Sequence, residues 1–210
     1  MDGLCLIVSG GEYSPLPLEL EPPAFVIACD RGWRWAERLG LRPDLVVGDF
    51  DSAPPPEELP VERHPTRKDD TDTMLALRRA IELGWRELAV CCALGGRFDH
   101  AFANVQAAAW AVRRGGRVRL LGKGTEILVF GGGVERFPRR EGWSLSLFSL
   151  SDRCDGVTVT GTKYACEDVL LTGDFPLGVS NVWASEEAEV RVSNGVLAVV
   201  QCRLRPGEHI

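Results

Sequence analysis

Aspartates recur at short spacing in four separate segments of the first half of the chain. They are Asp30, Asp49 with Asp51, Asp69 with Asp70 and Asp72, and Asp99. Two ionised carboxylates about 4 Å apart repel by roughly 4 kcal/mol at an effective dielectric constant of 20, so three together need a proton or a cation. Oxygen ligands favour Mg²⁺ over zinc, and Mg²⁺ commonly binds phosphates as well. If Asp49, Asp51 and Asp72 converge, we expect a magnesium site.

Two glycine pairs and nearby basic residues add a phosphate-binding signal. Gly10-Gly11 and Gly95-Gly96 each follow an apolar run, and glycine lets backbone N–H groups approach an anion. Arg67, Lys68 and Arg97 lie beside the aspartates and could balance the charge of a polyphosphate. Each feature alone also fits a turn, a helix cap or a solvated surface residue. The interpretation therefore depends on their grouping.

Short apolar runs alternate with helical patterns through residues 1–122. The runs are Leu4–Ser9, Ala24–Cys29, Leu45–Val47, Glu87–Ala93 and Val118–Leu121. Continuous apolar runs separated by helices are typical of a parallel sheet covered on both faces. Apolar residues at helical spacing predict helices near Met74–Ile81 and Phe102–Val112, each with one core-facing stripe. We expect a Rossmann-like α/β domain, with each aspartate segment at the carboxyl end of a strand, where such sheets bind ligands.

From residue 123 the helical period disappears and short alternating segments replace it. Trp143–Leu147 alternates between apolar and polar residues, and Val157–Thr160 is β-branched. Ala188–Val192 and Val196–Cys202, joined through Asn194-Gly195, predict a hairpin with a type I′ turn. We expect residues 123–210 to form an all-β domain, a β-sandwich of jelly-roll type.

Composition argues against several classes of protein. The chain is 45% hydrophobic and 26% charged, as in globular proteins. Its net charge is −6, without a basic half, so we expect no nucleic-acid partner. No apolar run is long enough to span a bilayer, and no basic segment precedes Leu4–Val8, so we expect a cytoplasmic protein without a membrane partner. The seven cysteines lie mostly in apolar runs and are predicted to be buried apolar residues.

Several motifs, in order along the chain, resemble those of the thiamine pyrophosphokinase family. They are Cys29–Gly32, Pro43–Ser52, Lys68–Asp72, Gly95–His100, Gly161–Tyr164 and Ser180-Asn181. The similarity runs over nearly the whole chain. One departure is Arg31, which stands where a small residue is usual after the first aspartate, and its role is open.

The resemblance implies an enzyme that transfers the diphosphate of ATP to the hydroxyl of thiamine, giving thiamine diphosphate and AMP. It implies a catalytic α/β domain joined to a thiamine-binding and dimerisation β-sandwich. It also implies a homodimer whose active sites are completed at the subunit interface. The expected ligands are ATP, thiamine and Mg²⁺.

The resemblance also implies roles for individual residues. Asp49, Asp51 and Asp72 would hold Mg²⁺ and act in catalysis. The nucleotide and its phosphates would be bound by Asp30, Gly32, Lys68, Asp69, Thr71, Arg97 and Asp99. Thiamine would contact Ser180, Asn181 and Trp183. Trp183 extends the motif: its ring could stack on thiamine, or it could be a core residue of the β-domain.

Three other functions stay open at this point. A haloacid-dehalogenase-like phosphatase would use Asp49 and Asp51 as nucleophile and acid, but that motif normally ends the first strand of its fold, and here at least two strands precede it. A pyrophosphokinase of the same fold could act on another alcohol, such as a hydroxymethyl-pterin. The chain could also be a non-catalytic nucleotide or thiamine sensor.

Overall fold

The computed structural model describes residues 1–50, 54, 57–65, 70–208 and 210. The chain divides into two units, Met1–Lys123 and Gly124–Ile210. Asp51, Lys68 and Asp69, which the sequence assigns to the site, lie outside the described residues. Among the described helices, none combines the length and the hydropathy needed to cross a bilayer.

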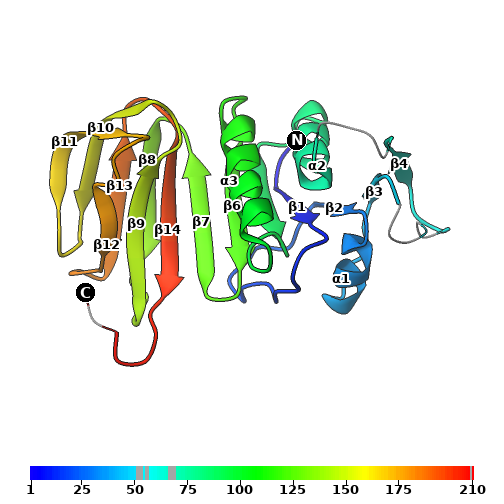
Figure 1. Cartoon of the computed structure of the whole chain (residues 1–210), viewed down its shortest axis with the longest axis horizontal. Helices are drawn as coiled ribbons and strands as arrows, with labels where there is room; N and C mark the ends of the chain where they lie inside the picture. Colours follow the sequence, from blue (N-terminus) through cyan, green and yellow to red (C-terminus); the bar gives the residue numbers. More distant parts are fainter. Residues whose placement is uncertain (51–53, 55–56, 66–69, 209) are drawn as a thin grey trace. The chain divides into compact units, whose positions relative to one another are not determined.

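The first unit is a parallel sheet with three described helices (Figure 1). Its strands are β1 (Leu4–Val8), β2 (Phe25–Cys29), β3 (Leu45–Gly48), β4 (Val61–Arg63), β5 (Glu87–Cys91) and β6 (Arg117–Gly122). Its helices are α1 (Gly32–Arg38), α2 (Asp72–Glu82) and α3 (Phe98–Val112). The five predicted apolar runs are strands, and the short β4 is an addition, because Val61-Glu62-Arg63 has no apolar run to reveal it.

The strand order in this unit is β6-β5-β1-β2-β3-β4, with every pair parallel. The chain builds outward from β1 through β2, β3 and β4 and then returns to place β5 and β6 on the other side of β1. The order therefore reverses at β1. In open α/β sheets ligands bind at such a reversal, beyond the carboxyl ends of the strands.

Apolar side chains fill both faces of β1, which explains its continuous apolar sequence. Leu4, Leu6 and Val8 share a core with Ala36 of α1. Because side chains alternate along a strand, Cys5 and Ile7 point to the opposite face, and they are buried too.

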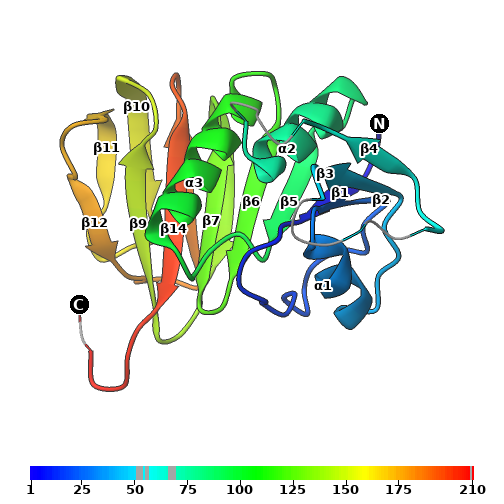
Figure 2. The same ribbon diagram turned by 45° about the vertical axis from the view of Figure 1, so that its right-hand side comes forward.

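Helix α3 packs on α2 and on β6, and Figure 2 shows α2 and α3 side by side. The predicted core-facing stripe of α3 is partly wrong, because Phe102 is 55% exposed. The buried face is instead made of small residues, including Ala107, Ala108 and Ala111, together with Asn104. Small side chains allow a helix to approach its neighbours closely, and the larger Phe98 and Phe102 remain exposed.

The second unit consists of two packed antiparallel sheets (Figure 1). Its strands are β7 (Thr125–Phe130), β8 (Gly133–Pro138), β9 (Trp143–Ser149), β10 (Arg153–Thr160), β11 (Cys166–Thr172), β12 (Gly178–Asn181), β13 (Glu187–Val192) and β14 (Leu197–Arg203). One sheet has the order β12-β9-β14-β7 within this unit, and the other has β11-β10-β13-β8. Side chains of both sheets share one hydrophobic core, among them Leu147 and Leu197 from the first and Val157 and Val190 from the second.

The predicted hairpin of Ala188–Val192 and Val196–Cys202 is wrong. Strand β13 pairs with β8 and β10, whereas β14 pairs with β7 and β9 in the other sheet. Each strand turns apolar residues toward the shared core, so the Asn194-Gly195 segment crosses between the sheets instead of reversing within one. Gly195 is required there, because a Cβ would collide with the carbonyl oxygen of Arg153.

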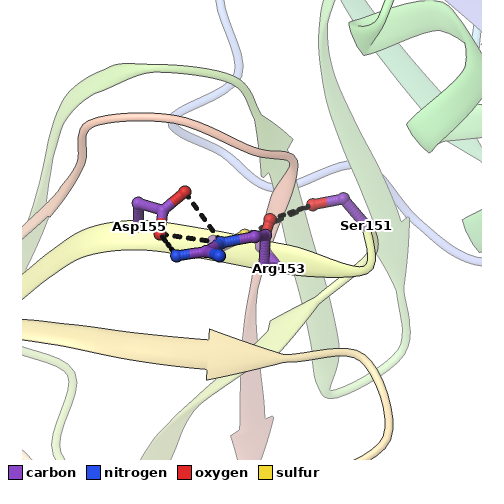
Figure 3. Close-up of polar contacts among 4 residues, drawn as sticks. Ser151, Arg153 and Asp155 are labelled. Carbon is purple, nitrogen blue, oxygen red and sulfur yellow. Dashed lines mark hydrogen bonds and ion pairs between the residues drawn. The ribbon is translucent and has the colours of Figure 1, made fainter.

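Ser151 and its neighbours hold this crossing at the start of β10. The Ser151 Oγ donates to the Arg153 carbonyl oxygen at 2.8 Å and accepts from the Val196 N–H at 3.0 Å. Figure 3 shows the first of these bonds beside the ion pair of Arg153 with Asp155. The Asp155 N–H donates to the Asn194 carbonyl oxygen at 2.9 Å. The segment that crosses between β13 and β14 is thus held by hydrogen bonds to residues at the start of β10.

Candidate active site

A pocket of about 470 Å³ lies where the strand order of the first unit reverses. Its walls are the loops after β1, β2 and β5 and the first turns of α2 and α3. The lining residues are Ser9, Gly10, Gly11, Glu12, Cys29, Asp30, Arg31, Thr71, Asp72, Thr73, Ala93, Gly95, Gly96, Arg97, His100 and Asn104. Four segments that the sequence singled out therefore meet in one cavity: the two glycine pairs, with Arg97 beside the second, and the segments that contain Asp30 and Asp72.

The predicted site residues divide into three groups. Asp30, Thr71, Asp72 and Arg97 line the pocket, and Asp30 is only 9% exposed. The described residues Gly32, Asp49 and Asp99 are near these loops in sequence but are not part of the lining. Asp51, Lys68 and Asp69 are not described.

Three strands of the first unit end in a residue with left-handed backbone geometry. Asp30 follows β2 with φ 43°, Phe50 follows β3 closely with φ 59°, and Cys92 follows β5 with φ 56°. Side chains other than glycine rarely adopt this conformation, and such residues gather at functional sites. The same conformation after three strands of one sheet marks this edge of the sheet as specialised.

The Gly10-Gly11 turn is held tightly between two elements. The Gly11 N–H donates to the Cys92 carbonyl oxygen at 3.0 Å, and the Trp35 indole N–H donates to the Gly11 carbonyl oxygen at 3.0 Å. A Cβ on Gly11 would collide with the Cys92 carbonyl oxygen. The glycine is thus required by close backbone contact, which the sequence alone could not distinguish from an ordinary turn.

Gly32 has a packing role of the same kind. A Cβ at this position would collide with the carbonyl oxygen of Val8 and crowd that of Ser9. Glycine therefore lets α1 begin directly against the carboxyl end of β1. The contact explains the residue without any ligand.

The first turn of α2 is fixed by two hydroxyl groups. The Thr71 Oγ1 caps the helix by accepting from the Met74 N–H at 3.2 Å. The Thr73 Oγ1 lies 2.8 Å from the Ser9 Oγ, and this buried hydrogen bond joins α2 to the end of β1. Asp72 stands between these two anchors and lines the pocket. Ser9 and Thr73 were not predicted as part of the site, because a single hydroxyl residue in the sequence does not indicate its partner.

Asp70 belongs to the same aspartate segment but has another partner. Its Oδ2 lies 2.8 Å from Nη2 of Arg78 on α2. The Arg78 guanidinium also lies 5.5 Å from the ring centre of Trp110 on α3. Asp70 is therefore tied to the helix layer, whereas Asp72 faces the cavity.

Arg97 and Asp99 form an ion pair at the start of α3. The Arg97 Nε donates to the Asp99 Oδ1 at 3.1 Å, and a second bond joins Nη2 to Oδ2. Asp99 also accepts from the His100 N–H at 3.0 Å. The bond from Arg97 is the main cause that lowers the pKa of Asp99. In the chain without ligand, the charge of Arg97 is thus shared with a carboxylate.

The donor set at this edge fits a hard cation. Asp72 lines the pocket, and Asp49, directly after β3, is partly buried. Within the described ranges no three His, Cys, Asp or Glu side chains are grouped as a metal site, and the third predicted ligand, Asp51, falls in a gap between those ranges. Carboxylate oxygens alone suit Mg²⁺ better than zinc.

The second unit has an apolar pocket of about 270 Å³ that includes Asn181 and Tyr164 in its lining. The Asn181 Oδ1 accepts from the N–H groups of Tyr164 and Val182, each at 3.0 Å. Its Nδ2 donates to the Thr162 Oγ1 at 3.1 Å and to the Tyr164 carbonyl oxygen at 2.8 Å. The side chain is therefore engaged in holding the Thr162–Tyr164 loop. Its neighbour Ser180 is exposed and has φ 62°.

Trp183 lies inside the second unit. It is 7% exposed, and its indole N–H donates to the Phe137 carbonyl oxygen at 2.8 Å. It belongs to the hydrophobic core shared by the two sheets. The geometry of this unit favours the core alternative for Trp183 over stacking on a ligand.

Comparison with known proteins gives the same division of the chain. The family model "Thiamin pyrophosphokinase, catalytic domain" matches residues 17–120, inside the first unit, and "Thiamin pyrophosphokinase, vitamin B1 binding domain" matches residues 136–197, inside the second. The chain belongs to the thiamine pyrophosphokinase family. It is an enzyme family, and nothing in these matches supports a haloacid-dehalogenase-like phosphatase. Asp49 also follows the third strand, not the first.

Individual thiamine pyrophosphokinases are similar over almost their whole length. The enzyme of Bacillus subtilis strain 168 is 27% identical over an alignment of 207 positions, and the alignment covers 93% of this chain and 96% of that protein. A crystal structure of thiamine pyrophosphokinase from Bacillus subtilis has a TM-score of 0.83 at 25% identity, covering 95% of this chain and 99% of that one. One from Geobacillus thermodenitrificans has a TM-score of 0.79 at 25% identity, covering 95% and 97%.

Proposed function

We propose that the protein transfers the diphosphate of ATP to the hydroxyl of thiamine, giving thiamine diphosphate and AMP. The observation that carries this proposal is the pocket at β1, which brings together Asp30, Asp72 and Arg97 from separate motifs. It does so in a chain whose two units match the catalytic and vitamin B1 binding models of one enzyme family.

The nucleotide is proposed to bind in this pocket of the first unit. Arg97 would contact the phosphates, and Thr71 and Asp30, which belong to the same lining, would surround the nucleotide. Asp99 would act through Arg97, its ion-pair partner. Gly32 supports the site by letting α1 begin close to β1. Lys68 and Asp69 remain proposed nucleotide contacts.

We propose Asp49, Asp51 and Asp72 as the residues that hold Mg²⁺. When bound, the ion would neutralise part of the phosphate charge and help align the triphosphate. The support is chemical, because a carboxylate-only donor set beside a phosphate pocket suits this ion. Asp70 is not included, because Arg78 already balances its charge.

The proposed reaction is an in-line displacement. The hydroxyl oxygen of thiamine forms a bond to the β-phosphorus of ATP, the bond from that phosphorus to the bridging α–β oxygen breaks, and AMP leaves. The hydroxyl proton passes to a carboxylate, for which Asp49 or Asp51 is the proposed acceptor. No covalent enzyme intermediate is needed, because positioning and charge neutralisation account for most catalysis in phosphoryl transfer.

Thiamine is proposed to contact the second unit at Ser180 and Asn181. The apolar pocket beside Asn181 supports this, since an organic cation with apolar rings needs such a surface. Trp183 would support this site indirectly, by packing in the core of the unit. Its ring is buried, and its N–H already donates to the Phe137 carbonyl oxygen.

The finer description of the protein is also proposed: a Rossmann-like first unit, a jelly-roll-like second unit, a homodimer and a cytoplasmic location. Exposed apolar side chains on the second unit, including Phe175, Leu177 and Val179, support burial against a second copy. The seven cysteines are free, as expected in a reducing compartment. Sedimentation equilibrium measures the oligomeric state directly.

A product assay tests the function. Incubation with ATP, Mg²⁺ and thiamine should give AMP and thiamine diphosphate in equal amounts. If AMP forms only with another alcohol, such as a hydroxymethyl-pterin, then that alcohol and not thiamine is the acceptor. Release of inorganic phosphate would indicate a phosphatase, and binding of nucleotide or thiamine without any product would indicate a sensor. Each of these outcomes rejects the proposed reaction.

A further inference from the structure

Arg31 is a pocket residue to which the family motif assigns no role. It lies between Asp30, at the end of β2, and the first residue of α1. Its Nε donates to the Gly10 carbonyl oxygen at 2.7 Å, and its side chain lines the pocket. The bond links the loops after β1 and β2, which are separated by 21 positions in sequence.

The charges around the pocket distinguish Arg31 from the other arginine there. The charged side chains in the lining, His100 apart, are Glu12, Asp30, Asp72, Arg31 and Arg97. Arg97 already shares its charge with Asp99. Among the residues that the structure describes, Arg31 has a backbone carbonyl as its partner and no carboxylate. Of the two arginines in the lining, Arg31 is therefore the one that forms no ion pair with a described acidic side chain.

The geometry of the bond leaves the useful part of Arg31 available. A guanidinium has five N–H donors in a planar fork, and the Gly10 bond uses the one on Nε. Within the described part of the chain, the donors on both terminal nitrogens have no hydrogen-bond partner, and the Nε bond limits how the guanidinium can turn. A planar pair of donors of this kind matches two oxygens of a phosphate.

We propose that Arg31 binds the β- and γ-phosphates of ATP while its Nε holds the Gly10-Gly11 turn in place. The proposal rests on the proposed function for the nature of the ligand. It assigns Arg31 two tasks: one end of the guanidinium fixes the loop, and the other meets the part of the nucleotide that AMP lacks. The residue thereby helps the site distinguish the triphosphate substrate from the AMP product.

Calorimetric titration of Arg31→Met with ATP and with AMP, both in the presence of Mg²⁺, tests this proposal. Methionine keeps most of the side-chain length and removes the charge. We expect the Kd for ATP to rise about 10- to 100-fold, as for loss of a charge-assisted hydrogen bond. The Kd for AMP should change less than about twofold, since AMP lacks the two phosphates that Arg31 is proposed to contact. Arg31→Lys should give an intermediate Kd for ATP, because one ammonium cannot serve both partners with the same geometry.

Arg34→Met is the matched control. Arg34 is an exposed arginine of α1, the helix that follows Arg31; it is stacked on Trp33 and absent from the pocket lining. The Arg34→Met variant should bind ATP and AMP with the same Kd values as the unaltered protein. Melting temperatures of all variants separate binding from folding.

Three results would overturn the role of Arg31. They are unchanged ATP binding by Arg31→Met, equal weakening of ATP and AMP binding, and an ATP defect that Arg34→Met reproduces. The proposed function fails differently. If the unaltered protein binds ATP through Arg31 but makes no thiamine diphosphate, the phosphate contact stands and the reaction is rejected.

Discussion

The two units of the molecule use polar side chains in opposite ways. In the first unit, the charged side chains of Asp72 and Arg97 line a pocket, while the buried hydroxyl groups of Ser9 and Thr73, which belong to the same lining, hold the elements together. In the second unit, Asn181 of the motif and the nearby Trp183 themselves make the bonds that hold their strands and loops. A parallel sheet ends its strands together at one edge, so polar residues there can serve a ligand. In two packed sheets, the same residue types become part of the framework.

Replacing Asp72 should have the largest effect and would test the first half of this comparison. Asp72→Asn keeps the shape but removes a charge from the pocket. We expect kcat to fall about 10³-fold, equivalent to about 4 kcal/mol, with little change in melting temperature. Asp49→Asn should behave alike, because it is the other described residue proposed to hold Mg²⁺. Initial rates of AMP formation at saturating Mg²⁺ measure the effect.

Asp70→Asn provides the control for this experiment. It makes the same chemical change two positions away, in a carboxylate that pairs with Arg78. Because both side chains of this pair are partly exposed, we expect at most a small loss of activity. Equal loss in Asp70→Asn and Asp72→Asn would mean that the whole segment acts as a unit and that the pocket does not single out Asp72.

Trp183→Phe tests the second half of the comparison. The substitution leaves a small cavity in the core and removes the donor to the Phe137 carbonyl oxygen. We expect the free energy of unfolding to fall by about 2 kcal/mol, measured by urea denaturation, with the KM for thiamine unchanged. Trp143→Phe, in a partly buried tryptophan of the same unit, should cost about 1 kcal/mol or less. A stable Trp183→Phe variant with a strongly raised KM for thiamine would show that the ring serves the ligand.

What the sequence predicted in the first unit followed from strong local patterns. The apolar runs located five strands, and the position of Asp30 and Asp49 after them located the edge of the sheet. The contacts that hold this edge were not predictable. The bond of Ser9 with Thr73 joins residues 64 positions apart, and neither residue type indicates such a partner.

Two errors show where local patterns are insufficient. The Asn194-Gly195 pair has the residues of a hairpin turn, but strands β13 and β14 belong to different sheets because each must cover the same core. Along α3, Phe102 has the spacing of a core residue, yet the alanines are buried and Phe102 is not. In the first case the structure depends on the strands that pair with β13 and β14, and in the second on the elements that pack against α3. The sequence of the segment itself does not indicate where those other elements lie.

The smallest expected effect is a change in the pKa of a single carboxyl group. It can be measured by comparing two similar ion pairs, one in each unit. Asp99 pairs with Arg97 beside the pocket, and Asp155 pairs with Arg153 in the packed sheets. In each pair the hydrogen bond from the arginine lowers the pKa of the carboxyl group. Each pair therefore favours the folded chain above the ordinary aspartate pKa of about 3.9, and this contribution is lost as the pH falls through the lowered value.

Nucleotide binding should separate the two pairs. If Arg97 turns toward phosphate, Asp99 loses its main partner and gains a negative neighbour, and both changes raise the pKa of Asp99. The pKa of Asp155 should stay where it is, since the ligand is proposed to bind the first unit. Carboxyl carbon shifts followed by NMR over pH, with and without a non-hydrolysable ATP analogue, measure both groups in one sample. An equal shift in the two carboxyls would point to a general change in the protein, and no shift in Asp99 would mean that Arg97 keeps its carboxylate partner when the nucleotide is bound.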